Sequence, residues 1–136
     1  MKTLVTGGYG MVGSVMESQI KLSRETCDLT NPKQTESLFR TIRPDGVIHC
    51  AGKVGGIGGN SNYKGEYFYD NLMINTNVIE ASRKAGVKNL VAFLSTCVFP
   101  DNVKYPLTVD QVHLGEPHES NYPYAYAKRM ADVQIR

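Results

Sequence analysis

The sequence has no block of lysine and arginine residues and no large excess of either charge. Its 15 basic and 13 acidic side chains leave a formal net charge of +2. Proteins that bind nucleic acids or anionic membranes usually carry a basic patch or stripe. The charge pattern therefore favours neither partner, and we expect the ligand to be a small molecule.

Cysteine is scarce, and its spacing excludes two common structural roles. Cys27, Cys50 and Cys97 are odd in number, lack C-x-x-C spacing, and do not cluster with the three histidines of the chain. A disulfide framework uses paired cysteines, and a structural zinc site needs clustered Cys and His ligands. We therefore expect reduced thiols, no metal site and a cytoplasmic protein.

Long hydrophobic runs are also missing. The longest apolar runs have the length of a strand, and the opening MKTLVTGG leads directly into a strand and a turn, without the apolar core of a signal peptide. A chain of 136 residues with 41% hydrophobic content has enough material for one core and too little for two. We expect a single domain over residues 1–136.

What the sequence does contain is a regular alternation of strand-like and helix-like segments. Gly13 precedes a segment with room for about two helical turns, Thr30 or Asn31 is the expected N-cap of the second helix, with Pro32 in its first turn, and Gly86 is expected at the C-terminus of the third. The expected strands are 3–6, 20–23, 46–52 and 89–95. One long helix is expected to stop before Pro44 and the other to span 66–84, and the glycine-rich segment 52–65 is expected to be a loop.

This alternation predicts the α/β class, with a doubly wound, Rossmann-like parallel sheet that stops after about four strands. The continuous apolar run NLVAFLS at 89–95 is typical of a parallel strand covered on both faces. The usual topology orders such strands 3-2-1-4. The 89–95 strand would then lie at an open edge, where a fifth strand belongs.

The stretch VTGGYGMVGS places Gly7, Gly10 and Gly13 between the first strand and the first helix. In dinucleotide-binding proteins the first glycine of such a motif makes a tight turn, the second lets the backbone approach a pyrophosphate, and the third lets helix and strand pack together. The alternative is a glycine turn with a structural role alone. The position of the three glycines directly after the first strand favours dinucleotide binding.

The end of the second strand bears on the choice between NAD and NADP. Enzymes that prefer NAD usually hold the ribose 2′-hydroxyl with an acidic residue there, whereas this strand runs into Ser23 and Arg24. A guanidinium at this position suits a 2′-phosphate and favours NADP. The alternative is a solvated Arg24, and Glu25 beside it weakens the inference. Asp28 and Leu29 follow where an adenine would lie.

Ser95 and Cys97 follow the fourth strand, at the carboxyl end where open α/β sheets bind ligands. If the strand continues through them, their side chains share one face, because side chains alternate along a strand. Both would then point into one cleft. By position alone, Cys97 is more often a small buried hydrophobe than a catalytic thiol.

The stretch YPYAYAKR near the C-terminus places Tyr124 and Lys128 four residues apart, one turn apart on the same face of a helix, while Tyr126 points away from Tyr124. A nearby ammonium stabilises a phenolate and lowers the pKa of the phenol toward neutrality. The alternative is a surface tyrosine that stacks on a lysine stem. The glycine turn and the strand-end serine, which precede this pair in order, favour the catalytic interpretation.

TGGYGMVG, NLMINTNVIEA, the strand-end serine and YAYAK resemble the fingerprints of the extended short-chain dehydrogenase/reductase superfamily, in order and over essentially the whole chain. GKVGG, STCVFP and PYAYAK are similar to the GDP-L-fucose synthase family, which carries a cysteine two residues after the catalytic serine. Sugar 4-epimerases and dehydratases usually lack that cysteine. Asn71 matches a superfamily asparagine with a positional role at most.

The resemblance implies an enzyme that epimerises C3 and C5 of GDP-4-keto-6-deoxy-mannose and then reduces the C4 ketone with NADPH. Tyr124 would protonate the C4 alkoxide, Lys128 would lower the pKa of Tyr124 and hold the nicotinamide ribose, Ser95 would bind the ketone, and Cys97 would be one acid/base of the epimerisation. The residues expected to contact the cofactor are Gly7, Gly8, Tyr9, Gly10, Met11, Val12, Gly13, Arg24, Asp28, Leu29, Ala51, Gly52 and Lys128.

The family also has features that this chain lacks. They are two further strands, a sugar-nucleotide domain and a histidine downstream of the lysine, a role we do not transfer to His113 or His118. We therefore expect a fragment, or an N-terminal half that needs a second polypeptide. In relatives the helices equivalent to 66–84 and 124–136 pack across a dimer interface, which implies a homodimer. Two alternatives remain: a catalytically silent NADP-binding module, and another extended nucleotide-sugar reductase or epimerase.

Overall fold

A computed structural model describes all residues, 1–136, and its chain forms two compact units. The first unit comprises Met1–Gly52 and Met73–Phe93. The second comprises Lys53–Leu72 and Leu94–Arg136. The helix α3 (Lys64–Lys84) contributes residues to both. The expectation of one incomplete domain over residues 1–136 remains a prediction.

The first unit contains a parallel four-stranded sheet, which confirms the predicted α/β class. Its strands are β1 (Thr3–Thr6), β2 (Ile20–Lys21), β3 (Gly46–His49) and β4 (Asn89–Ala92), in the order β2-β1-β3-β4. The predicted order 3-2-1-4 is wrong, because β3 pairs with β1, with Leu4 opposite Val47. The segment between β2 and α1 (Pro32–Ile42) forms turns instead of another strand, so β2 is the edge on that side.

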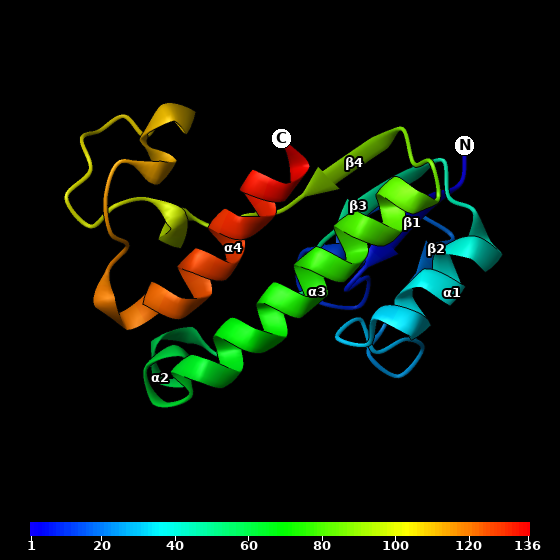
Figure 1. Cartoon of the computed structure of the whole chain (residues 1–136), viewed down its shortest axis with the longest axis horizontal. Helices are drawn as coiled ribbons and strands as arrows, with labels where there is room; N and C mark the ends of the chain where they lie inside the picture. Colours follow the sequence, from blue (N-terminus) through cyan, green and yellow to red (C-terminus); the bar gives the residue numbers. More distant parts are fainter. The chain divides into compact units, whose positions relative to one another are not determined.

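Two helices pack against the sheet in the first unit, α1 and the C-terminal half of α3 (Figure 1). Asn31 caps α1 as predicted, because its side chain accepts hydrogen bonds from the backbone N–H groups of Lys33 and Gln34. Gly86, with φ of +71°, follows the C-terminus of α3, also as predicted. The buried residues of the core come from strands, turns and helices: Leu4, Leu22, Cys27, Leu29, Phe39, Val47, Val78 and Ala81.

The prediction that the fourth strand is covered on both faces is wrong. Exposed and half-buried residues alternate along β4, and the side chains of Val91 and Phe93 are 55% and 39% exposed. Alternating burial is what a strand with one uncovered face shows. The predicted edge position of this strand is confirmed, because β4 pairs only with β3.

The segment after the glycine loop also differs from the prediction. Instead of two α-helical turns it forms one 3-10 turn, η1 (Gly13–Val15), and Met16 is already extended. The chain has to reach β2 by Ile20, and the hydroxyl of Ser18 donates to the carbonyl of Thr3 to guide it there. Few residues are left for a helix between these two points.

The glycine-rich segment after β3, predicted as a loop, contains a short helix of the second unit, α2 (Gly56–Asn62). A Cβ at Gly55 or Gly59 would lie 2.1 or 2.6 Å from the hydroxyl of Tyr67, so the absence of side chains there leaves room for the tyrosine. Asn60 holds the helix by donating to the side-chain oxygen of Asn121, 3.1 Å away. The other elements of this unit are η2 (Thr96–Val98), η3 (Val109–His113), η4 (Glu119–Asn121) and α4 (Tyr122–Ile135).

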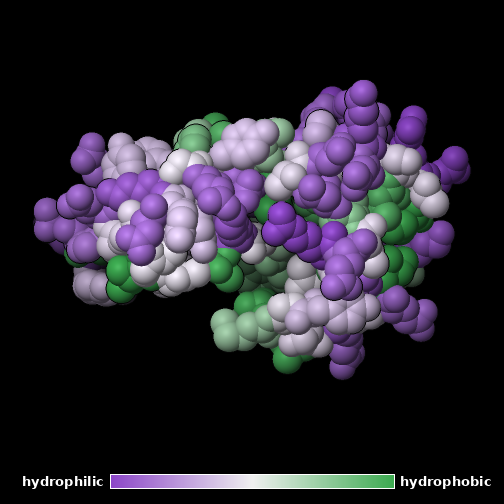
Figure 2. Space-filling view, turned by 90° about the horizontal axis from the view of Figure 1, so that it is seen from below, coloured by the Kyte–Doolittle hydropathy of each residue, from purple (hydrophilic) through white to green (hydrophobic).

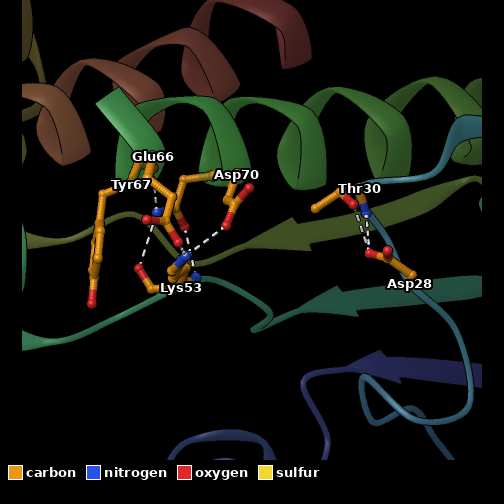
Figure 3. A network of polar contacts seen from close by, with 7 residues as sticks. Asp28, Thr30, Lys53, Glu66, Tyr67 and Asp70 are labelled. Carbon is orange, nitrogen blue, oxygen red and sulfur yellow. Dashed lines mark hydrogen bonds and ion pairs between the residues drawn. The ribbon is translucent and has the colours of Figure 1, made fainter. Parts of the chain in front are cut away.

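Lys53, which begins the second unit, is held at the start of α3 by a network of polar contacts (Figure 3). The fully buried side chain of Asn71 binds both the backbone N–H and the carbonyl of Lys53, at 2.9 and 3.0 Å. The ammonium of Lys53 pairs with Glu66 and, at 2.8 Å, with Asp70. These contacts fix the backbone of Lys53 against α3, so Asn71 has a positional role.

No helix combines the length and the apolar character needed to cross a bilayer. On the face shown in Figure 2, hydrophobic side chains reach the surface in separate patches between hydrophilic ones.

Candidate active site

The glycine loop of the first unit is a tight turn. Gly7 has a φ of +64°, and a Cβ there would lie 2.8 Å from the backbone of Ala51. A Cβ at Gly13 would lie 2.2 Å from the carbonyl oxygen of Gly7. The N–H of Gly10 donates to the same carbonyl at 3.0 Å. Glycine is therefore required at positions 7 and 13 by the fold of the loop itself.

Gly10 differs from the other two, and its surroundings fit a bound phosphate. A Cβ there would meet a single atom, the Gly7 carbonyl oxygen at 3.3 Å, and Gly10 is exposed. This is the open backbone that close approach of a pyrophosphate needs. The helix whose N-terminal N–H groups usually face the phosphates is reduced to η1, so that part of the expected binding site is missing.

The residues after β2 are organised by Asp28 (Figure 3). Its carboxylate accepts hydrogen bonds from the N–H and the hydroxyl of Thr30, at 3.0 and 2.7 Å. The hydroxyl and backbone bonds from Thr30 lower the pKa of Asp28. Arg24 is exposed, as a ligand for a 2′-phosphate would be, and the side chain of Leu29 is buried in the core.

The Thr30 contact makes a pH-dependent contribution to stability. Because the pKa of Asp28 is lower in the folded than in the unfolded chain, the contribution is present above the unfolded value of about 3.9 and is lost as the pH falls through the folded value. We expect Thr30→Val to lower the free energy of unfolding by up to about 1 kcal/mol at pH 7. The difference from wild type should shrink on acidification.

Urea unfolding at a series of pH values measures this effect. Thr41→Val is the matched control, because the Thr41 hydroxyl donates to the backbone carbonyl of Ser37 and contacts no titratable group. A Thr30→Val difference that stays constant down to low pH would contradict the assignment.

The carboxyl end of β3 is fixed by a buried hydrogen-bond chain that the sequence analysis missed. The Thr6 hydroxyl contacts Nδ1 of His49 at 2.6 Å, and Nε2 of His49 contacts the side-chain oxygen of Asn75 at 3.0 Å. All three side chains are buried, and the N–H of Ala51 donates to the Thr6 hydroxyl at 3.4 Å. The chain holds Ala51 beside Gly7. A polar residue in each of three apolar segments was the only sequence signal.

In the second unit, Ser95 and Cys97 are brought together by a helix cap. β4 ends at Ala92, so the predicted shared strand face is wrong. Ser95 is the N-cap of η2, and its side-chain oxygen accepts the backbone N–H of Cys97 at 3.2 Å. Because that oxygen acts as an acceptor, the hydroxyl proton of Ser95 stays free to be donated elsewhere.

Tyr124 and Lys128 lie one turn apart on α4, with Pro123 in its first turn. Lys128 is 4% exposed and Tyr124 is half-buried. Burial, and after it the charge of a nearby ionised Cys97, raises the pKa of Tyr124. This direction is opposite to the expected lowering by Lys128. The phenol is therefore a proton donor at neutral pH, and it lies within electrostatic range of the Cys97 thiol.

The raised pKa predicts that Tyr124 ionises above the ordinary value of about 10 for a tyrosine. In an alkaline titration followed by phenolate absorbance, Tyr124→Phe should remove the last phase. Tyr105→Phe, at a tyrosine that is 81% exposed, is the control and should leave that last phase in place. Loss of an early phase in Tyr124→Phe would contradict the assignment.

Three further features of the second unit had little signal in the sequence. Tyr126, which points away from Tyr124 as predicted, packs on Tyr122 with ring centroids 4.8 Å apart. Arg129 is buried and donates to backbone carbonyls. His118 and Cys97 line the same cavity of about 260 Å³. No group of three or more His, Cys, Asp or Glu side chains is placed to hold a metal ion.

Together, these residues supply a phenol that remains protonated, a free serine hydroxyl proton and a thiol within the second unit. This set can bind a carbonyl oxygen, protonate an alkoxide and exchange protons on a carbon beside the carbonyl. The glycine loop of the first unit leaves space for a phosphate beside Gly10.

Comparison with curated proteins finds GDP-L-fucose synthases. The chain is 43% identical over 144 residues to a probable GDP-L-fucose synthase from Drosophila melanogaster and to GDP-L-fucose synthase from Dictyostelium discoideum. Both alignments cover 98% of this chain and 45% of the relative. The chain thus spans less than half the length of these relatives.

Two solved structures have the same fold. The chain matches a GDP-L-fucose synthetase from Naegleria fowleri bound to NADP, with a TM-score of 0.85, 38% identity, and coverage of 96% of this chain and 42% of that one. It matches a GDP-D-glycero-L-gluco-heptose synthase from Campylobacter jejuni, solved in the presence of NADPH, with a TM-score of 0.89, 26% identity, and coverage of 97% and 41%.

The sequence model of the NAD dependent epimerase/dehydratase family matches residues 3–136, almost the entire chain. With the parallel sheet and the glycine turn already described, this match shows that the chain belongs to the NAD dependent epimerase/dehydratase family.

Proposed function

We propose that this chain is the cofactor-binding and catalytic N-terminal part of an NADPH-dependent enzyme that converts GDP-4-keto-6-deoxy-mannose into GDP-L-fucose. The observation that carries the proposal is that Tyr124 and Cys97 lie in one unit, close enough for the charge of the thiolate to contribute, after burial, to the raised pKa of the phenol. A reductase needs the phenol, and an epimerase that acts beside a ketone needs a further acid/base such as the thiol. The 43% identity to GDP-L-fucose synthases supports the same substrate.

The epimerisation uses the acidity of the protons on C3 and C5, which flank the C4 carbonyl. Cys97 removes or returns a proton at these carbons, and the enolate oxygen at C4 accepts a hydrogen bond from the free hydroxyl proton of Ser95. The backbone N–H of Cys97 donates to the side-chain oxygen of Ser95, which orients the Ser95 side chain within the turn that carries Cys97. The second acid/base of this reaction is not assigned to a residue of this chain.

The reduction uses α4. NADPH, when bound, supplies a hydride to C4, and the C4 oxygen becomes an alkoxide that takes the phenolic proton of Tyr124. The raised pKa of Tyr124 keeps that proton in place until the alkoxide forms, because an alkoxide is far more basic than a phenolate. Lys128, one turn along α4, holds the nicotinamide ribose in this proposal.

The cofactor contacts in the first unit are proposed at the glycine loop. The Gly10 backbone faces the pyrophosphate, and Arg24 binds the 2′-phosphate that distinguishes NADP from NAD. The match to a relative bound to NADP supports this choice. Arg24→Ala should weaken NADPH binding and leave NADH binding unchanged, which a fluorescence titration of each reduced cofactor would detect.

We also propose that the protein is a cytoplasmic homodimer through α3 and α4. Exposed hydrophobic side chains on these helices support the proposal: Phe68, Tyr69, Met130, Val133 and Ile135. Sedimentation should give twice the mass of one chain for the wild type and the mass of one chain for Val133→Glu. A monomeric wild type would contradict the proposal.

The test of the activity is incubation of the protein with NADPH and GDP-4-keto-6-deoxy-mannose, followed by analysis of the sugar product. We expect NADPH oxidation and GDP-L-fucose. If the protein binds NADPH but neither oxidises it nor converts the sugar, it is a catalytically silent nucleotide-binding module instead.

A second candidate, an extended reductase or epimerase of another GDP-sugar, is favoured by the TM-score of 0.89 to the heptose synthase. It predicts that Cys97→Ser keeps full activity, whereas the proposal predicts loss of epimerisation.

A further inference from the structure

Arg129, the residue after Lys128 on α4, carries a buried guanidinium that pairs with no carboxylate. It is 3% exposed. Its Nε donates to the carbonyl of Val98 and its Nη1 to the carbonyl of Gly115, each at 2.7 Å. The ring of Tyr126 lies 5.2 Å from the guanidinium carbon, and Nη2 has no hydrogen-bond partner.

Stability alone does not explain an arginine at this position. Burial of a charge is expensive unless hydrogen bonds satisfy it, and one nitrogen of this guanidinium is unsatisfied. The guanidinium has no ionic partner, so hydrogen bonds to neutral carbonyls are what offset the cost of removing its charge from water. The rigid fork of the guanidinium instead supplies two fixed donor directions, which lysine or methionine lacks.

The two carbonyls that Arg129 binds lie near the two ends of one segment, 99–117. Val98 ends η2 and directly follows Cys97, and Gly115 lies near the return of the segment 99–117. The ends of this segment are joined by a bridge between Pro100 and Pro117, and by the N–H of Asp101, which donates to the carbonyl of Glu116. Arg129 therefore ties the turn that carries Cys97 to the helix that carries Tyr124.

We propose that Arg129 is a positioning residue that holds the Cys97 thiol in its place relative to the Tyr124 phenol. The inference rests on the proposed function for its chemistry. The backbone of α4 itself places Tyr124 and Lys128, whereas the position of the turn that carries Cys97 depends on the hydrogen bond from Arg129 to the Val98 carbonyl. Loss of this hydrogen bond therefore affects proton exchange at C3 and C5, the step of Cys97, more than hydride transfer to C4.

The test compares Arg129→Met and Arg129→Lys with Arg136→Met, at an exposed arginine at the end of the same helix. Deuterium uptake by GDP-4-keto-6-deoxy-mannose in D2O, measured without NADPH, isolates the proton exchange. We expect it to fall roughly 10- to 100-fold in Arg129→Met, because a displacement of about 1 Å has an effect of this size. NADPH oxidation with the already epimerised 4-keto sugar should keep its rate, and Arg136→Met should match wild type in both assays.

A second readout does not depend on the enzymatic activity. Iodoacetamide alkylation of Cys97, followed by mass spectrometry of its peptide, should become several times faster in Arg129→Met, because the half-buried thiol is freed with its turn. Cys27, buried in the core of the first unit, is the internal reference and should not change. Arg129→Lys should lie between wild type and Arg129→Met.

The outcomes separate this inference from the proposed function. If the wild type takes up no deuterium, the proposed function fails, and the alkylation rates still decide the position of Cys97. If Arg129→Met shows the same rates of deuterium exchange and of Cys97 alkylation as the wild type, the inference is overturned. If the methionine variant does not fold, the lysine variant decides by the same measurements. Failure of both to fold would also overturn it, because Arg129 would then act on stability.

Discussion

Replacement of Tyr124 by phenylalanine should lower the rate of NADPH-dependent reduction by about 10²- to 10⁴-fold, the usual contribution of a positioned proton donor. The change removes one oxygen from a half-buried ring and leaves α4 intact. The alkoxide at C4 then has to take its proton from water. NADPH oxidation under saturating substrate measures the loss, and deuterium exchange without NADPH should persist, because Cys97 is the residue proposed for that step.

The matched control is Tyr126→Phe on the same helix. The ring of Tyr126 packs against Tyr122 and Arg129. Its loss of a hydroxyl should leave the reduction rate close to wild type. Equal losses in the two variants, or none in Tyr124→Phe, would remove Tyr124 from the proposed chemistry.

Alanine at Gly13 should disrupt the glycine loop of the first unit. A Cβ at this position would lie 2.2 Å from the Gly7 carbonyl oxygen and 2.8 Å from the Cα of Gly8, and both neighbours are backbone atoms that cannot rotate away. Overpacking of this kind lowers the free energy of unfolding by about 1–3 kcal/mol. We expect that loss in urea unfolding, together with loss of NADPH binding in a fluorescence titration.

Gly10→Ala separates the stability of the loop from its binding function. The added Cβ meets one atom at 3.3 Å, so the free energy of unfolding should stay within about 0.5 kcal/mol of wild type. NADPH affinity should nevertheless fall, because the methyl group occupies the space proposed for the pyrophosphate. Unchanged affinity in Gly10→Ala would place the cofactor elsewhere, even if Gly13→Ala unfolds the loop as expected.

The features predicted correctly from the sequence depend on local chemistry. The cap at Asn31 and the glycine after α3 follow from backbone groups that a neighbouring side chain or a positive φ satisfies. The features predicted wrongly depend on partners far along the chain. The α2 helix is held by a hydrogen bond to Asn121, and burial of the two faces of β4 depends on the elements that pack against each face. No local pattern encodes such contacts.

The candidate site divides in the same way. The spacing of Tyr124 and Lys128 predicted their shared helix face, because i and i+4 neighbours meet whatever the tertiary structure. The pKa direction of Tyr124 was predicted wrongly, because it is set by burial and by Cys97, which is 27 positions earlier in the sequence. Arg129 had no signal, since an arginine on a terminal helix is usually solvated.

The most direct test of the proposed chemistry follows the hydride from NADPH to the sugar. NADPH that carries deuterium at the transferred position should give GDP-L-fucose with deuterium at C4 and at no other carbon, in an amount equal to the NADPH oxidised. Tyr124→Phe should give little product, labelled at the same position. Product that lacks deuterium at C4, or that forms without oxidation of NADPH, would contradict the assignment of this chain to a reductase.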